Sequence, residues 1–277
     1  MTEIEGVGDD LTRRLDDGVL WITINRADSG NALTSPMRDQ IPRWMDDASA
    51  DPFVRAVVLT AAGERHFCTG ADLRGVGRVT QARPEGAPDR MVGEAGRIIQ
   101  RGWQRMVGSI LDCEKPVICG VNGTAAGGGM HLALACDLVI MSDTARFIEI
   151  FIRRGIAPDA GGAYLLARLI GPQRAKELFF FGDDVSAADA ERIGLVNRVV
   201  PAGELQKTLD EWAGRLAHAP TRAIAFTKWL VNRSLETDRT GAFWDEAHVQ
   251  ELVSGTEDSK EGVASFLERR DAQFKGW

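Results

Sequence analysis

The sequence predicts an α/β protein with a sheet-based core and a helical C-terminal third. In the N-terminal half, short runs rich in β-branched and aromatic residues alternate with helical patterns, and after about residue 186 the pattern becomes helical. Strands separated by helices need crossover connections, which bury most of the sheet. The length of 277 residues suits one large domain or a domain with an appended piece, at roughly 100–200 residues per domain.

The first elements are defined by composition and turn signals. Residues 19–25 (VLWITIN) are predicted as a strand because they follow the Asp-Asp-Gly turn at 16–18. Residues 31–50 are predicted as a helix with Pro36 near its first turn. Residues 55–60 form the next expected strand, which the Ala-Ala-Gly turn at 61–63 ends.

The middle of the chain continues this alternation. Residues 116–121 and 137–141 read as strands, and residues 123–136 between them read as a glycine run leading into an apolar helix. Residues 74–93 carry glycines, prolines and charges without sustained periodicity. They are therefore predicted as a loop of functional length.

The last third is predicted to be helical. Ser186 and Asp189 resemble a capping box, and Gly194 ends the short helix that follows. Further helices are expected over 220–235, 240–253 and 257–270, and no repeat of 20–50 residues is present in the sequence.

Charge and composition exclude several classes of protein. The net charge of −7 and the pI of about 5.3 argue against a nucleic acid or an anionic membrane as the main partner. The acidic start lacks the profile of an export signal, and no stretch reaches the ~18 apolar residues that span a bilayer, so a cytoplasmic protein is expected.

Known catalytic and metal motifs are absent from the sequence. It contains no phosphate-binding G-x-x-x-x-G-K-[ST], no G-x-G-x-x-G after a strand, no H-E-x-x-H and no G-x-S-x-G. The four cysteines have no C-x-x-C spacing, so they are expected to be reduced, buried thiols, and no metal site is predicted.

Two glycine-containing strand exits remain as candidate sites. Residues 122–129 (NGTAAGGG) follow a strand and begin an apolar helix, where free N–H groups can stabilise a developing oxyanion. Residues 122–129 could equally form a tight turn with only a structural role. Residues 66–73 (HFCTGADL) form a second strand exit in which Asp72 could be a simple helix cap.

Together these segments resemble the crotonase superfamily, the enoyl-CoA hydratase/isomerase family. The resemblance covers roughly residues 10–275, and the matching runs are T-G-A-D-L at 69–73, K-P-V-I-C-G-V-N-G at 115–123, A-A-G-G-G at 125–129, L-A-L-A-C-D at 132–137, P-D-A-G-G at 158–162 and G-L-V-N-R-V-V at 194–200. It implies a crotonase (ClpP-like) spiral of ββα units in residues 1–200 and a helical trimerisation region in 201–277. It also implies acyl-CoA substrates, a homotrimer or dimer of trimers, and no cofactor beyond the coenzyme A of the substrate.

The resemblance also assigns roles to residues. The backbone N–H groups of Ala71 and Gly128 would form an oxyanion hole for the thioester oxygen, which gains charge in the transition state. Contacts with the CoA part of the substrate are implied for a second group of residues: Arg26, Ala32, Gly70, Asp72, Leu73 and, from its own or a neighbouring subunit, Lys275. Arg26 could equally be a solvated turn residue.

Two departures from the family pattern matter for the chemistry. Where hydratases of this family carry two glutamates that hold a water, this chain has His131 and Phe151. Phe151 cannot transfer a proton. His131 could be catalytic or a packed, hydrogen-bonded histidine, and Glu149 lies two residues from the lost carboxylate.

Asp159 is the remaining carboxylate at a family catalytic position. Its apolar neighbours at 156–158 should desolvate it and raise its pKa, which suits an acid/base, although it could also cap the helix that begins near Gly161. One carboxylate favours an enoyl-CoA isomerase, and the local sequence is most similar to the phenylacetate-pathway isomerase branch. An atypical hydratase, nucleophilic attack by Asp159 and a CoA-thioester-binding protein without chemistry remain alternatives.

Overall fold

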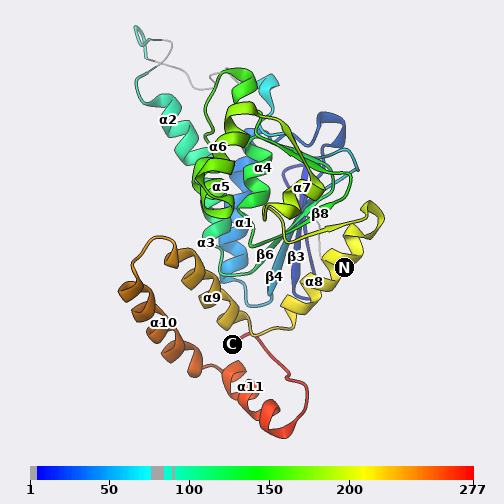
Figure 1. Ribbon diagram of the computed structural model, residues 1–277, viewed down its shortest axis with the longest axis vertical. Coiled ribbons are helices and arrows are strands. Elements are labelled where there is room, and N and C mark those ends of the chain that lie inside the picture. The colour runs from blue at the N-terminus through cyan, green and yellow to red at the C-terminus, as the bar shows by residue number, and fades with distance from the viewer. Residues whose placement is uncertain (1–4, 76–83, 89–90) are drawn as a thin grey trace.

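The main sheet runs through the centre of the protein. The computed structural model describes residues 5–75, 84–88 and 91–277 (Figure 1). Its seven-stranded sheet has the order β1 (Glu5–Gly6), β2 (Leu11–Asp16), β3 (Val19–Ile24), β4 (Ala56–Ala61), β6 (Val117–Val121), β8 (Leu138–Ser142) and β11 (Arg198–Val200). From β3 onward all neighbours are parallel, whereas β1–β2–β3 is antiparallel. The predicted α/β class is confirmed.

A second, smaller sheet is built from the short strands that follow the long ones. Its order is β10 (Asp184–Ser186), β9 (Arg146–Ile148), β7 (Thr124–Ala126) and β5 (His66–Cys68). β5 follows β4 in the chain, β7 follows β6, and β9 follows β8, and β5, β7 and β9 pair in parallel. Each turn of the chain therefore adds one strand to both sheets, which is the expected spiral of ββα units.

Helices cover both faces of the main sheet. On one face, α8 (Leu205–Ala217) packs against a cluster that includes Trp21, Val58 and Ile118. The larger cluster lies on the other face, under α1 (Ser35–Ala50), α3 (Arg105–Asp112) and α4 (Gly128–Leu134). The two clusters use alternate residues of the same strands because side chains of a strand point to opposite faces. All four cysteines are free and buried, as expected.

Several predicted boundaries need correction. The helix expected from residue 31 begins at Ser35, because Asn31 has a positive φ of 53° and the Thr34 side chain caps the helix at the N–H of Met37. The glycine run predicted to lead into an apolar helix contains the short strand β7, and the helix α4 begins at Gly128 after Gly127, which has a φ of 53°. Of the predicted loop at 74–93, residues 76–83 and 89–90 lie outside the described part of the chain.

The C-terminal helices match their predictions closely. Helices α9 (Thr221–Ser234), α10 (Arg239–Ser254) and α11 (Glu257–Glu268) form an arm that extends from the sheet-based body (Figure 1). The capped helix predicted after Ser186 is α7 (Ala187–Arg192), and the Ser186 side chain accepts from the N–H of Asp189. The proposed division at residue 200 stays a prediction.

The helix expected near Gly161 is α5 (Gly162–Ile170). Five helical segments were not located from the sequence: α2 (Glu94–Ile99), the π-helical segment Gln100–Gln104 that joins α2 to α3, α3 itself, α6 (Pro172–Phe181) and α8. Short 3₁₀ turns also occur at Ala27–Ser29, Leu73–Gly75, Ile152–Arg154 and Ala202–Glu204. The π-helical segment and α5 border the candidate site.

Candidate active site

Two neighbouring strand exits bring Ala71 and Gly128 close together. A Cβ atom on Gly70 would lie 3.3 Å from the carbonyl oxygen of Ala126 and 3.7 Å from the backbone nitrogen of Gly128. Gly70 has a φ of 96°, a conformation that side chains disfavour, so glycine is needed both for the turn and for the close approach. The residue after it, Ala71, therefore lies beside the start of α4.

The N–H groups of these two residues are available as donors. Leu33 donates to the carbonyl of Gly70 and accepts from Asp72, both at 2.9 Å, so the N–H of Ala71 between them points away from Leu33. Gly128 is the first residue of α4, and the first N–H groups of a helix have no intrahelical acceptor. Within the described residues, neither N–H has a protein acceptor. The predicted oxyanion-hole pair is thus geometrically possible.

Glycines hold α4 tightly against its surroundings. A Cβ atom on Gly129 would lie 2.1 Å from the carbonyl oxygen of Cys68, and one on Gly128 would lie 2.5 Å from the ring of Trp103. Trp103 comes from the π-helical segment and is 9% exposed. Trp103 was not predicted as a site residue, because it lies in a segment without a strong helical pattern. Its ring forms one wall beside the Gly128 donor.

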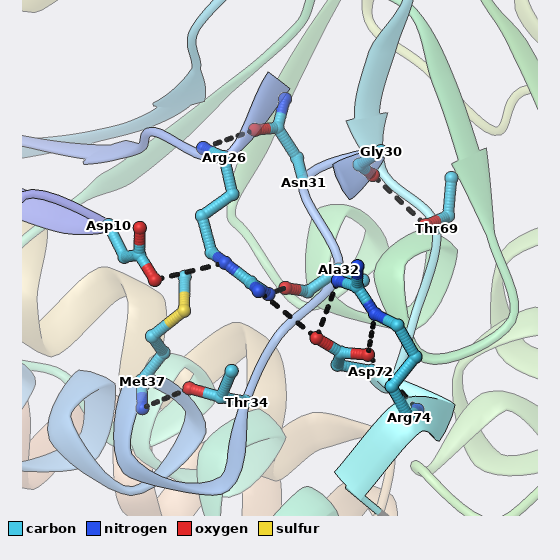
Figure 2. Close-up of polar contacts among 10 residues, drawn as sticks. All are labelled: Asp10, Arg26, Gly30, Asn31, Ala32, Thr34, Met37, Thr69, Asp72 and Arg74. Carbon is cyan, nitrogen blue, oxygen red and sulfur yellow. Dashed lines mark hydrogen bonds and ion pairs between the residues drawn. The ribbon is translucent and has the colours of Figure 1, made fainter. Parts of the chain in front are cut away.

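An ion-pair network fixes the loop that follows Ala71 (Figure 2). Arg26 donates from Nη2 to Oδ2 of Asp72 at 3.0 Å and from Nη1 to the carbonyl of Ala32 at 2.6 Å, and its Nε lies 3.0 Å from Oδ2 of Asp10. The Arg74 side chain and backbone N–H also donate to Asp72, and this, with Arg26, holds the pKa of Asp72 far below its usual range.

This ion-pair network tests the alternative roles predicted for Arg26 and Asp72. Arg26 is not a solvated turn residue, because its side chain is 13% exposed and paired. Asp72 does cap the 3₁₀ turn at Leu73–Gly75 through the N–H of Arg74, and it also forms ion pairs. Contacts of Arg26, Ala32, Gly70, Asp72 and Leu73 with CoA stay predictions.

Asp159 lies in the segment before α5 and is partly buried. Burial raises the pKa of its carboxyl above the usual range, and the charge of His131 opposes this rise. The N-cap of α5 is Gly161, which has a φ of 80°, and no side chain caps this helix. The alternative that Asp159 is a helix cap is therefore wrong. Gln104, another residue that sequence analysis missed, donates to the carbonyl of Asp159 at 3.3 Å.

His131 is enclosed and hydrogen-bonded. Its Nε2 lies 2.9 and 3.2 Å from the two carboxylate oxygens of Glu149, and the exposed fractions of the side chains are 0% and 1%. The ring of Phe151 stacks on the imidazole with centroids 5.2 Å apart. In the structure His131 is therefore a packed, hydrogen-bonded residue, which was one of the two alternatives predicted for it. Its catalytic role stays a prediction.

Lys275 is not brought to this site within the chain. Its carbonyl accepts from Arg55, which directly precedes β4, whereas the candidate site lies beyond the other end of that strand. A contact from a neighbouring subunit stays a prediction. Tyr164 of α5 is 36% exposed, and its hydroxyl donates to Glu236 at 2.7 Å.

Neither a metal site nor a membrane-spanning helix is found among residues 5–75, 84–88 and 91–277. There, no group of three or more His, Cys, Asp or Glu side chains is arranged to hold a metal ion. Over the same residues, every helix is too short or too polar to cross a membrane.

The fold and the paired glycine turns define the class of protein. A family profile described as enoyl-CoA hydratase/isomerase matches residues 14–277, and the structural neighbours have the crotonase fold. The chain belongs to the enoyl-CoA hydratase/isomerase family, as its motifs indicated.

Individual relatives carry the names of two activities. The chain is 36% identical to 1,2-epoxyphenylacetyl-CoA isomerase of Escherichia coli K12, over 96% of this chain and 98% of the relative. It is also 36% identical to crotonyl-CoA hydratase of Syntrophomonas wolfei, over 91% and 92%. The crystal structure of enoyl-CoA hydratase from Bacillus anthracis superposes with a TM-score of 0.87 at 30% identity, over 97% of this chain and 100% of that one. These similarities do not separate isomerase from hydratase.

Proposed function

We propose that the protein is an enoyl-CoA isomerase that moves a double bond along the acyl chain of a CoA thioester. The thioester oxygen accepts hydrogen bonds from the N–H groups of Ala71 and Gly128. Asp159 removes a proton from an activated carbon, which leaves an enolate. The electron pair then shifts along the chain, and Asp159 returns the proton at another carbon, so no atom is gained or lost.

The observation that carries this proposal is the partly buried Asp159 with its raised pKa. A general acid/base works best when its pKa lies near the working pH, and burial moves a carboxyl in that direction. Gln104 and Trp103 lie close together in the π-helical segment, and they contact Asp159 and Gly128 respectively. This arrangement supports a common pocket for the carboxyl and the donor.

Hydration is the second candidate, and the named hydratase relatives favour it. It requires groups that hold and split a water molecule. Glu149 is a carboxylate near the position of Phe151, but it is 1% exposed and both its oxygens face His131. A protein that binds CoA thioesters without chemistry is the remaining alternative.

Deuterium exchange separates these functions. The protein is incubated with 2-enoyl-CoA and 3-enoyl-CoA in deuterated water, and the products are followed by mass spectrometry. An isomerase interconverts the two with deuterium incorporation, and a hydratase yields 3-hydroxyacyl-CoA. Binding without exchange or rearrangement would refute the enzyme assignment. Exchange that survives Asp159→Asn unchanged would refute Asp159 as the base.

We also propose that copies of the chain assemble through the C-terminal arm into a homotrimer or a dimer of trimers. Large apolar side chains are exposed there, including Phe243, Trp244 and Phe266 at 64%, 68% and 81%. A cavity of about 1060 Å³ lies between α9 and the core. Exposed apolar surface of this kind marks an interaction site. Light scattering of the purified protein tests the assembly state.

The remaining expectations rest on the family and the sequence. We propose that the enzyme needs no cofactor apart from the CoA of its substrate and no metal, and that it works in the cytoplasm. Dialysis against a chelator followed by the exchange assay tests the first of these, because a metal-dependent enzyme would lose activity.

A further inference from the structure

A side chain outside the proposed reaction holds the backbone of Asp159. Residues 157–160 lie between the 3₁₀ turn at Ile152–Arg154 and α5, and they form neither helix nor strand. Gln104 donates from Nε2 to the carbonyl oxygen of Asp159 at 3.3 Å. Among the described residues, this is the only hydrogen bond that reaches the backbone of residues 157–160 from another part of the chain.

Packing fixes the chain after Asp159 but not before it. Ala160 is fully buried, and a Cβ atom on Gly161 would lie 3.3 Å from Cγ1 of Val107 in α3. By contrast, residues 152–157 are all exposed, so packing gives this stretch little support. The carbonyl of Asp159 lies at the boundary between the anchored and the exposed stretch. A single hydrogen bond at this point therefore has a large effect on how the residue is oriented.

Gln104 belongs to a rare type of helical turn. The N–H of Arg105 donates to the carbonyl of Gln100, and this i→i+5 bond defines the π-helical segment between α2 and α3. Such turns occur mostly as single insertions within α-helices, and frequently at functional sites. The segment is supported from α1, because a Cβ atom on Gly102 would lie 2.6 Å from the guanidinium carbon of Arg38. The π-helical segment is therefore packed on the body of the protein.

The same segment contacts the proposed oxyanion donor. The ring of Trp103 lies 2.5 Å from the position that a Cβ atom on Gly128 would take. Trp103 is 9% exposed and directly precedes Gln104 in the chain. Adjacent residues of one helical turn therefore contact both halves of the proposed site, which are the donor at the start of α4 and the acid/base before α5. This turn links the position of one half to that of the other.

We propose that Gln104 is a positioning residue for Asp159: its amide holds the Asp159 carbonyl and thereby fixes the carboxyl relative to the N–H of Gly128. The proposal rests on the proposed function, in which Asp159 is the acid/base. A neutral amide suits this task, because a lysine or arginine there would place a positive charge near the carboxyl and lower its pKa. Placement matters because a shift of about 1 Å in a reacting group costs about a hundredfold in rate.

Gln104→Met removes the donor with little other change. Methionine is unbranched, similar in length and similar in helix propensity to glutamine. We expect kcat to fall about ten- to a hundredfold, because the acid/base is no longer held in place. KM should change by less than about twofold, because the thioester is bound through other groups, among them the N–H groups of Ala71 and Gly128. The interconversion of 2-enoyl-CoA and 3-enoyl-CoA measures both constants.

Gln100→Met is the matched control. Gln100 is also exposed and lies in the same π-helical segment, but its side chain makes no hydrogen bond among the described residues. Both variants exchange the same amide for the same thioether, so their unfolding temperatures should agree within about 4 °C. Gln100→Met should keep the wild-type kcat and KM. If Gln104→Met has the same kcat as Gln100→Met, then Gln104 does not position the acid/base and the proposal is overturned.

A double-mutant cycle tests whether Gln104 acts through Asp159. The reference is the residual rate of Asp159→Asn, measured by deuterium exchange over a long incubation. Adding Gln104→Met to this variant should cause no further loss, because the group that the amide positions is already disabled. The same fold-loss in both backgrounds would mean that Gln104 acts elsewhere, and this result would overturn the proposal.

Crystal structures of the variants separate this proposal from the proposed function, because they need no turnover. In Gln104→Met, the Asp159 carboxyl should lie about 1 Å or more from its wild-type position relative to the nitrogen of Gly128. In Gln100→Met it should not move. If the carboxyl stays in place in Gln104→Met, the proposal is overturned, even where Asp159→Asn abolishes activity. If the carboxyl moves while Asp159→Asn stays fully active, the proposed function fails but the positioning of Asp159 by Gln104 stands.

Discussion

Gly129→Ala tests whether close packing of α4 on β5 positions the donors of the proposed oxyanion hole. The added Cβ would lie 2.1 Å from the carbonyl oxygen of Cys68, which is a backbone atom and cannot rotate away. Contact at about 3.4 Å requires α4 and β5 to separate by about 1 Å. Overpacking a tightly packed interior costs about 1–3 kcal/mol, and the rigid partner places this substitution at the upper end.

The same displacement should reduce activity. At about 2–4 °C per kcal/mol, the loss of about 3 kcal/mol lowers the unfolding temperature by about 6–12 °C. Because the N–H of Gly128 moves with α4, the donors separate, and a misplacement of about 1 Å costs about a hundredfold in kcat. Calorimetry measures the first effect, and the isomerisation assay at saturating substrate measures the second.

The control is Gly108→Ala in α3, where an added Cβ meets no atom within 4 Å. Alanine favours a helix interior over glycine by about 1 kcal/mol, so this variant should be at least as stable as the wild type and fully active. If Gly129→Ala unfolds at the same temperature as Gly108→Ala and retains the wild-type kcat, then packing does not require glycine at position 129. The carbonyl of Cys68 would then not obstruct a side chain at position 129, contrary to the prediction.

Three further perturbations follow from the site. Asp72→Asn should lower the free energy of unfolding by about 1–2 kcal/mol in urea titrations, because Arg26 loses a charged acceptor. The pKa of Asp72 is lower in the folded state, so its contribution should be present above about pH 4 and be lost as the solution is acidified. Wild-type kcat/KM should begin to fall at a pH above the usual carboxyl range, because the pKa of Asp159 is raised; a limb at or below that range would contradict this. Trp103→Ala should cost about 3–5 kcal/mol by thermal unfolding, whereas Trp103→Phe should keep most stability.

The strands β3, β4, β6 and β8 and the helices α9, α10 and α11 were predictable because their patterns are local, whereas the six-residue strand β2 (LTRRLD) is largely polar and was missed. Residues 117–121 are a continuous apolar run, residues 19–24 are apolar except for Thr23, and Asp238 and Thr256 cap α10 and α11 with their side chains. The short strands β5, β7 and β9 were missed because each has three residues. A run of that length shows no period, and its strand conformation depends on pairing with distant segments.

The polar contacts of the site could not be predicted from the sequence, because they join segments that are far apart along the chain. His131 and Glu149 are 18 residues apart in sequence, and their contact exists only because α4 and the segment after β9 meet. The Arg26–Asp72 pair likewise joins segments separated by 46 residues. A family pattern could point to Ala71, Gly128 and Asp159 as candidates. It could not show that the Arg26 side chain binds Asp10, Asp72 and the carbonyl of Ala32. These contacts exist only once the loop over residues 26–34 has folded.

The spiral explains how one fold can support different reactions. The strands β5, β7 and β9 are parallel neighbours in the small sheet. The segments that follow them contain Ala71, Gly128 and Glu149, in that order. The first two exits contribute backbone donors, which require glycine and close packing but no particular side chain. The third exit and the segment before α5 contribute side chains: Glu149, Phe151 and Asp159. In the proposed mechanism, the thioester oxygen is therefore held by backbone groups that the fold positions, whereas the fate of the proton depends on a few side chains of the third turn. Substitutions at that turn should change the reaction while leaving thioester binding intact.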